Sequence, residues 1–228
     1  MQTASDYARA LLKQRSDRDK QTKVGASNLS TLCGRCLAHD LAGIRRNTSN
    51  RWWLGARVGT AIHEALEQKA SQDPNVLSEH RLVIGNIPGY GEVKSTLDLY
   101  RIPEQEVVDF KTTARDKNPA LRRALFEEPD EFDTDSVRSA RFKVEGYWNQ
   151  VHLYALGLDR PVQTCSIVFI NRDGKEDKDI WSASIPYDPE RAKAVWQRAL
   201  NVWEWLTAGG DPATVVAHED CWACNNEF

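Results

Sequence analysis

An Asp-x-Lys pair follows an apolar stretch that is typical of a buried strand. The pair is Asp109 and Lys111, in the segment VVDFKTT that begins at position 107. On a strand these two side chains share one face, so a carboxylate and an ammonium would lie side by side. Asp98 lies upstream in a second strand-like segment, STLDLY. Two carboxylates on neighbouring strands suit Mg²⁺ or Mn²⁺, and a lysine beside the ion can orient or deprotonate a water that attacks a phosphate.

Helical segments on either side add side chains that could join such a site. His63 follows Gly59 by one helical turn, and we expect the glycine to leave space for an ion or a phosphate oxygen beside the imidazole. Gln150 and Tyr154 share a helix face and can both donate hydrogen bonds to a phosphate. Taken singly, each feature has a structural alternative: a surface ion pair, a hydrogen-bonded helix histidine or a core tyrosine. We interpret His152, on another helix face, as structural.

Aromatic and basic residues precede the helix of His63: Arg51, Trp52, Trp53 and Arg57. Bases of a single strand stack on aromatic faces while arginines contact the phosphates, although burial in the core is the commoner fate of tryptophan. The first 60 residues hold 11 Lys and Arg against four Asp, whereas the whole chain has a net charge of −3. This basic segment indicates either a polyanionic partner or a solvated basic helix.

Four of the five cysteines form two Cys-x-x-Cys pairs near the ends of the chain. The pairs are Cys33 with Cys36 and Cys221 with Cys224, and the fifth, Cys165, lies in an apolar segment typical of a buried strand. Four thiolates complete a tetrahedral zinc site, and an iron–sulfur cluster uses the same ligands. The spacing leaves both open, with zinc the commoner. Bound metal would join the two ends by closing a very long loop.

Periodicity predicts the elements that must position these residues. We expect helices over 5–20, 55–69, 140–158 and 189–206, a short helix that begins near 27–30 and carries the first cysteine pair, and strands over 81–84, 92–100, 105–111, 162–171 and 179–185. This order predicts one mixed α/β domain over 1–228. Residues 27–45 and 211–228 would form a cysteine-clasped module, and the acidic stretch within 114–139 predicts an exposed loop or insertion.

The composition is that of a globular protein with a sizeable core, since 41% of the residues are hydrophobic and eight are tryptophan. No run of about 18 apolar residues occurs, so we expect no membrane-spanning helix. The amino-terminal residues lack the apolar centre of a signal peptide. We therefore expect a cytoplasmic location rather than export.

Taken in order, these motifs resemble the RecB-like branch of the PD-(D/E)xK nuclease superfamily. The match comprises Gly59-x3-His63, Asp98, Asp109-Phe110-Lys111 and Gln150-x3-Tyr154. The bracketing cysteines are similar to those of the iron–sulfur exonucleases associated with CRISPR systems and of the nuclease domains of helicase–nuclease complexes. The resemblance extends over about residues 27–224.

The resemblance implies a restriction-endonuclease-like α/β core, in which a mixed central sheet is flanked by helices. His63, Asp98 and Asp109 would be ligands of a catalytic Mg²⁺ or Mn²⁺ together with the Phe110 carbonyl. Lys111 would be the catalytic lysine. Gln150 and Tyr154 would position the DNA backbone, with Arg51, Trp52 and Arg57 as further substrate contacts. Cys33, Cys36, Cys221 and Cys224 would hold a [4Fe–4S] cluster, with zinc or a smaller iron–sulfur cluster as the alternative.

The implied activity is that of a metal-dependent DNA exonuclease acting on single strands or DNA ends. It would work inside a prokaryotic or phage-infected cell, alongside recombination, repair, replication or CRISPR adaptation proteins. Two alternatives stay open: a non-catalytic nucleic-acid-binding or scaffold subunit with structural zinc, and a structure-selective endonuclease.

Three features differ from the family pattern. Leu97 stands where the superfamily name expects proline. The cysteines are divided two and two, whereas relatives commonly have one near the start and three near the end. The stretch between Lys111 and Gln150 is long, which favours a substrate-gating or partner-binding insertion over 114–139.

Overall fold

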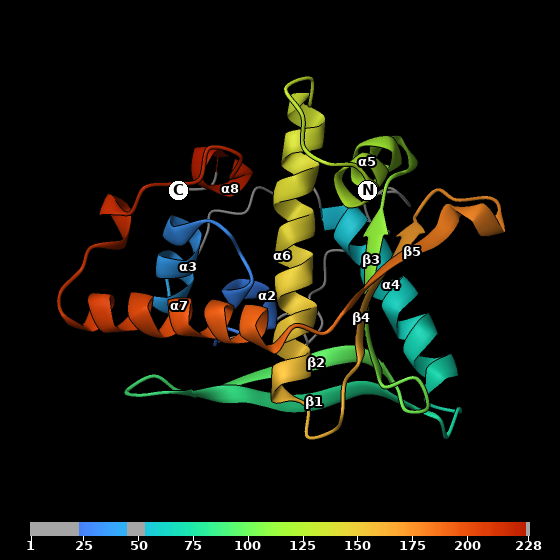
Figure 1. Cartoon of the computed structure of the whole chain (residues 1–228), viewed down its shortest axis with the longest axis horizontal. Helices are drawn as coiled ribbons and strands as arrows, with labels where there is room; N and C mark the ends of the chain where they lie inside the picture. Colours follow the sequence, from blue (N-terminus) through green and yellow to red (C-terminus); the bar gives the residue numbers. More distant parts are fainter. Residues whose placement is uncertain (1–22, 45–52, 227–228) are drawn as a thin grey trace, which may run out of the picture.

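A computed structural model describes residues 23–44 and 53–226 of the chain (Figure 1). The predicted helix over 5–20, Arg51 and Trp52 lie outside these residues. Within the described part, none of the helices combines the length and the hydrophobicity that crossing a bilayer requires.

A five-stranded sheet in the order β1-β2-β3-β4-β5 forms the centre of the fold. Its strands are β1 Val76–Ile87, β2 Gly91–Arg101, β3 Glu106–Thr113, β4 Thr164–Asn171 and β5 Ile180–Pro186. All neighbours are antiparallel except β3 and β4, which are parallel. A parallel pair needs a long crossover, and helices α5 and α6 provide it. The mixed α/β fold class is therefore confirmed.

The helices of the described residues are α2 Ala26–Leu29, α3 Gly34–Leu41, α4 Trp53–Ala70, α5 Asn118–Phe126, α6 Asp135–Gly157, α7 Pro189–Thr207 and α8 Trp222–Asn226. In Figure 1, α6 stands between two groups: α2, α3, α7 and α8 on one side, and α4, α5 and β3 to β5 on the other. Helix α6 supplies much of the core, with Val144, Trp148 and Val151 buried. Helix α7 begins as predicted, because the Asp188 carboxylate accepts hydrogen bonds from the N–H groups of Glu190 and Arg191.

Helices α4 and α6 cover opposite faces of β3. A Cβ added to Gly59 of α4 would lie 2.8 Å from Thr112 Oγ1, whereas Lys111 Nζ donates to Gln150 Oε1 of α6 at 3.0 Å. Neighbouring residues of a strand point to opposite faces, so β3 is held between the two helices. Any catalytic group on β3 is thereby fixed from both sides.

The structure corrects two expectations about local elements. The first cysteine pair is carried by α3, which begins just after Cys33, while residues 26–29 form the separate short helix α2. The flanks of 114–139 are helical, because they contain the 3-10 turn η3 Arg115–Lys117, α5 and the start of α6, whereas the acidic stretch 127–134 between the two helices is an exposed loop as expected. Arg123 of α5 and Arg141 of α6 hold this loop between the helices, since both pair with buried Asp133. The description of 114–139 as an insertion stays a prediction.

Candidate functional site

The candidate site lies where β2 and β3 separate. The two strands pair only from Leu99 with Val108 to Arg101 with Glu106. Beyond Val108, the β3 groups that face β2 have no strand partner and must bond elsewhere. Asp98 supplies one partner, because its Oδ2 accepts a hydrogen bond from Phe110 N at 2.7 Å. A carboxylate therefore lies in the opening between the strands, as a metal site there requires.

Asp109, Lys111 and Gln150 form a closed cycle of polar contacts on the α6 face of β3. Lys111 Nζ lies 2.7 Å from Asp109 Oδ2 and donates to Gln150 Oε1 at 3.0 Å, while Gln150 Nε2 donates to Asp109 Oδ1 at 3.2 Å. The Asp109 side chain is 2% exposed and that of Lys111 19%. The ammonium is thus held by a buried carboxylate and still reaches the surface of the site.

Burial and charge shift the proton affinities of this cycle. Burial raises the pKa of Asp109 to about 6, against the opposing effect of the Lys111 charge. Burial acts to lower the pKa of Lys111, but the Asp109 carboxylate outweighs it and holds that pKa above its ordinary value. At neutral pH the pair is therefore ionised, with a protonated lysine. A divalent cation beside Asp109 would lower its pKa again.

His63 approaches the opening from α4. Its Nδ1 lies 3.6 Å from Asp98 Oδ1, and the interaction with this carboxylate raises the pKa of the imidazole. The ring also packs edge-on against Phe110, with centroids 6.1 Å apart. The expectation for Gly59 is wrong, because the space beside this glycine is filled by the Thr112 side chain rather than left for an ion. Gly59 instead permits the close approach of α4 that brings His63 to the site.

Glu79 is a candidate ligand that the sequence analysis missed. One donor atom each from His63, Glu79 and Asp98 lie within 4.8 Å of one another. The register pairs Ser78 with Leu99 and His80 with Leu97, which places Glu79 opposite Asp98 on the adjacent strand. Two carboxylates placed opposite each other on neighbouring strands can contact one cation. Three oxygen and imidazole donors of this kind fit a hard divalent ion.

The backbone at Glu79 is strained. Its φ is 47°, in the left-handed region that residues other than glycine rarely adopt. Such strain is concentrated at functional sites. The only sequence signal is an acidic residue two positions before the strand predicted over 81–84, and this signal becomes informative only when the full extent of β1 and its register with β2 are known.

The remaining predicted site residues differ in their placement. Asp109 is outside the compact donor group of His63, Glu79 and Asp98, although the charges of His63 and Asp98 act on its pKa. Gln150 and Tyr154 share a face as predicted, with Gln150 Nε2 2.6 Å from Tyr154 Oη. Both are buried, at 7% and 4% exposure, so in this structure they support Asp109 rather than point outward.

Arg57 lies half-buried on α4, and Trp53 begins that helix. The structural interpretation of His152 is confirmed, because it is fully buried and its Nδ1 lies 2.7 Å from the Trp148 carbonyl.

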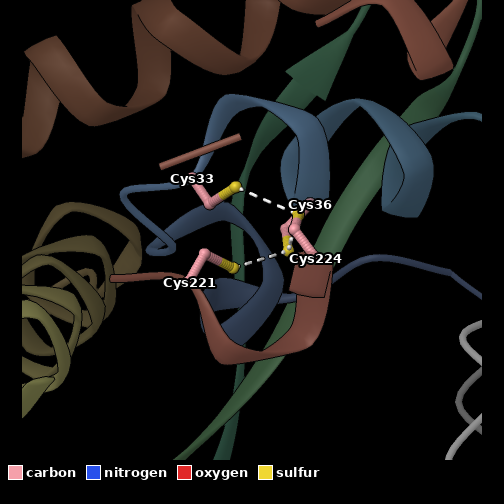
Figure 2. Close-up of side chains that lie close together, drawn as sticks. All are labelled: Cys33, Cys36, Cys221 and Cys224. Atoms are coloured by element: carbon pink, nitrogen blue, oxygen red, sulfur yellow. Dashed lines mark hydrogen bonds between the residues drawn. The ribbon is translucent and has the colours of Figure 1, made fainter. Parts of the chain in front are cut away.

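The four paired cysteines from the two chain ends cluster together (Figure 2). Their Sγ atoms lie 3.4 Å apart for Cys33 with Cys224, Cys36 with Cys221 and Cys36 with Cys224. A tetrahedral zinc ion with bonds of about 2.3 Å places its sulfur ligands about 3.8 Å apart, so the four thiols fit one such ion.

The surroundings of the cluster differ from those of the fifth cysteine. His218 N donates to Cys33 Sγ at 3.4 Å, and hydrogen bonds from Cys36 and His218 lower the pKa of Cys33 to about 4. A low pKa favours the thiolate, which is the form that binds metal. Burial raises the pKa of Cys224 in the cluster to about 12, and that of Cys165, which lies apart in β4, to about 12 as well, so the proximity of the other thiols rather than burial distinguishes the cluster. The expectation of a buried strand residue is confirmed.

Known protein families and structures were compared with the chain. No family model matches the sequence, and no curated protein matches it. Among solved structures, a protein from Eubacterium rectale described as a candidate exonuclease has a TM-score of 0.51 and 12% identity, with 99% of this chain and 92% of that one covered. LHK-Exo, an alkaline exonuclease from Laribacter hongkongensis solved with dAMP, has a TM-score of 0.50 and 12% identity over 82% of this chain and 89% of that one. At this identity the likeness shows the fold alone.

Proposed function

We propose that this chain is a divalent-metal-dependent nuclease that hydrolyses DNA phosphodiester bonds. One observation carries the proposal: the donors of His63, Glu79 and Asp98 meet beside the Lys111–Asp109 pair, at the opening between β2 and β3. A structural ion pair needs no imidazole and no additional carboxylates close by. The two exonuclease structures of similar fold support the same class of activity.

Mg²⁺ or Mn²⁺ would be held by His63, Glu79 and Asp98, with Asp109 and the Phe110 carbonyl completing the site. The Phe110 assignment follows from the backbone, because the N–H and C=O of one strand residue point to the same side. Phe110 N–H points to Asp98, so its carbonyl also faces the opening. When bound, the ion would polarise a phosphate oxygen and lower the pKa of a bound water.

Lys111 is proposed as the group that stabilises negative charge on the phosphate. Its raised pKa keeps it protonated at neutral pH, so it would orient the attacking water and offset charge rather than remove a proton. Asp109 and Gln150 fix its position, and the ammonium also lies 4.9 Å from the centroid of the Tyr147 ring. We propose that Gln150 and Tyr154 affect the substrate indirectly, by holding Asp109 and Lys111 in position.

We propose DNA ends or single strands as the substrate, within the RecB-like branch and in recombination, repair, replication or CRISPR adaptation. The sequence motifs support this branch, and the neighbours described as exonucleases support digestion from ends. Arg51, Trp52 and Arg57, which precede His63, are the proposed contacts to the incoming strand.

We propose a structural metal centre at the four clustered cysteines. The resemblance favours a [4Fe–4S] cluster, but the Sγ separations of 3.4 Å favour a single tetrahedral ion such as zinc, because four sulfurs around a multinuclear cluster must lie farther apart. We therefore propose zinc ahead of the cluster.

The proposed activity is tested with end-labelled single- and double-stranded DNA in Mg²⁺ or Mn²⁺. We expect digestion by the wild-type protein and none by Lys111→Ala, with Lys94→Ala as the matched control, since Lys94 is an exposed lysine of β2 paired with Glu92. Undiminished digestion by Lys111→Ala would overturn the assigned chemistry. A circular single strand separates the exonuclease from the endonuclease alternative. DNA binding without metal-dependent cleavage would favour the scaffold alternative.

A further inference from the structure

Arg172 is a half-buried arginine without a side-chain partner among the described residues. It follows the last residue of β4, and its backbone N–H donates to the Thr113 carbonyl at 2.9 Å. That bond places Arg172 beside Thr113, which ends β3 two residues after Lys111. Its guanidinium makes no hydrogen bond or ion pair within the described part of the chain. Partly desolvated charges are normally paired, so this guanidinium calls for an anion.

The neighbouring acids are occupied elsewhere. Asp173, adjacent in sequence, accepts the backbone N–H of Arg115 at 3.0 Å. Asp179 lies 3.5 Å from Arg115 Nε and also accepts backbone N–H groups from Lys175 and Glu176. Neither carboxylate neutralises Arg172, which leaves its charge available to a ligand.

Helix α4 is shaped to admit this side chain. A Cβ added to Gly55 would lie 2.3 Å from Arg172 Nη1, so the guanidinium packs directly against the helix at this glycine and a side chain there would make it shift. Gly55 precedes Gly59 by one turn and His63 by two. At 1.5 Å per residue, the guanidinium is about 12 Å along α4 from the imidazole. This separation suits a phosphate a short distance along a strand whose scissile bond lies at His63.

The same end of the sheet carries further positive charge. Lys117 lies in η3, just after β3, where Asp116 pairs with it at 3.0 Å, and Lys143 of α6 is close enough for the charge of Lys117 to act with burial in lowering its pKa. Lys143 therefore adds a second cation to Arg172 at this end of the sheet, whereas the charge of Lys117 is partly balanced by Asp116.

We propose that Arg172 binds a backbone phosphate of the DNA strand, at a position beyond the scissile phosphate. Its planar guanidinium offers the paired donors that a phosphate accepts. The inference rests on the proposed nuclease function. Arg172 is a substrate-positioning residue, and Gly55 is the residue of α4 against which its guanidinium lies.

The test measures DNA binding separately from cleavage. A fluorescein-labelled single strand is titrated with Lys111→Ala protein in Mg²⁺, at salt concentrations from ~50 to ~200 mM, and the slope of log K against log salt is determined. Adding Arg172→Gln should weaken binding about tenfold at the lowest salt and reduce the slope by about 0.7, the value for one phosphate contact to a single strand. Arg172→Lys should keep the slope, because it keeps the charge.

A matched control and a second variant make the test decisive. Arg101→Gln removes the same charge at the opposite end of the sheet, where Arg101 pairs with Glu104 and Glu106, and should leave affinity and slope unchanged. Gly55→Ala raises the helix propensity of this position, so it should not destabilise α4 by itself. It should nevertheless displace the Arg172 guanidinium and weaken DNA binding. Combining it with Arg172→Gln should add little further loss, because both remove one contact.

The outcomes separate this inference from the proposed function. An Arg172→Gln slope and affinity equal to those of the Lys111→Ala parent would overturn the phosphate contact, even if the wild-type protein digests DNA. A reduced slope in a protein whose wild type digests nothing would support the contact and overturn the nuclease. Absence of DNA binding by the parent would overturn the contact, and absence of digestion by the wild type as well would overturn both.

Discussion

Asp98 Oδ2 accepts the backbone N–H of Phe110 at 2.7 Å, across the opening where β2 and β3 cease to pair. The side chain of one strand thus takes the place of the missing backbone partner of the other. This bond fixes the carboxylate with its second oxygen, Oδ1, toward His63. A structural hydrogen bond and a candidate metal ligand are therefore combined in one side chain.

Substitution of Asp98 should separate these two roles. Asp98→Asn keeps an oxygen that can accept from Phe110 but loses the charge, so we expect stability to be nearly unchanged and cleavage to fall at least about 100-fold. Asp98→Ala loses the acceptor as well and should lower the free energy of unfolding by about 1–2 kcal/mol. Urea unfolding and a cleavage assay measure both, with exposed Asp159→Asn as control. Full activity in Asp98→Asn would contradict the ligand assignment.

Strain at Glu79 leads to a second prediction. Its φ of 47° suits glycine, so Glu79→Gly should be more stable than Glu79→Ala by about 1 kcal/mol in metal-free protein. Both variants should bind Mg²⁺ or Mn²⁺ more weakly, because each loses the carboxylate. Unfolding curves with and without the ion provide the measurement. An alanine variant as stable as the glycine variant would show that the strain is not present.

Gly59 and Thr112 should behave as a coupled pair. Gly59→Ala places a Cβ 2.8 Å from Thr112 Oγ1, so we expect a loss of about 1–2 kcal/mol and lower cleavage as α4 and His63 move outward. Thr112→Ala in the same chain removes that oxygen and should restore most of the lost stability and most of the lost cleavage. Purely additive losses in the double variant would argue that the two residues do not contact each other.

The buried Asp109 predicts how stability depends on pH. Its pKa is raised from 3.8 to about 6 in the folded metal-free protein, so between these values the folded state holds a proton that the unfolded chain has released. Asp109 therefore makes the free energy of unfolding decrease as pH rises from about 4 to about 6. Asp109→Asn should remove this part of the slope. Urea unfolding of both proteins at several pH values in this window measures the slope. Identical slopes for the wild type and Asp109→Asn would refute the raised pKa.

The identity of the metal at the cysteine cluster should determine the colour of the protein, and metal binding should contribute to its stability. A zinc protein should be colourless and contain one ion per chain, whereas an iron–sulfur protein should be brown and bleach on reduction. Cys36→Ser or metal removal should lower stability by about 5 kcal/mol, because the link between Cys33 and Cys224 closes a loop of 191 residues. Cys165→Ser serves as a control that leaves the metal content unchanged. Brown protein would restore the [4Fe–4S] proposal.

Much of the fold was predictable because it depends on local signals. The apolar stripe and the Asp188 cap identify α7, and the Asp109-x-Lys111 spacing places both side chains on one strand face. The two Cys-x-x-Cys pairs are local as well, and their clustering is confirmed. The acidic stretch within 114–139 is an exposed loop, as its composition predicts, but Arg123 and Arg141 join it to α5 and α6 through Asp133, and such contacts are not visible in local sequence.

Residue types and their periodicity were thus enough to establish the strand of Asp109 and Lys111, the helix of His63 and the thiol pairs. Only the tertiary structure placed Glu79 opposite Asp98, filled the space at Gly59 with Thr112 and set Arg172 against Gly55. The physical reason is one of range. Backbone periodicity and capping act over a few neighbouring residues, whereas strand register and close helix–sheet approach depend on surfaces brought together from distant parts of the chain.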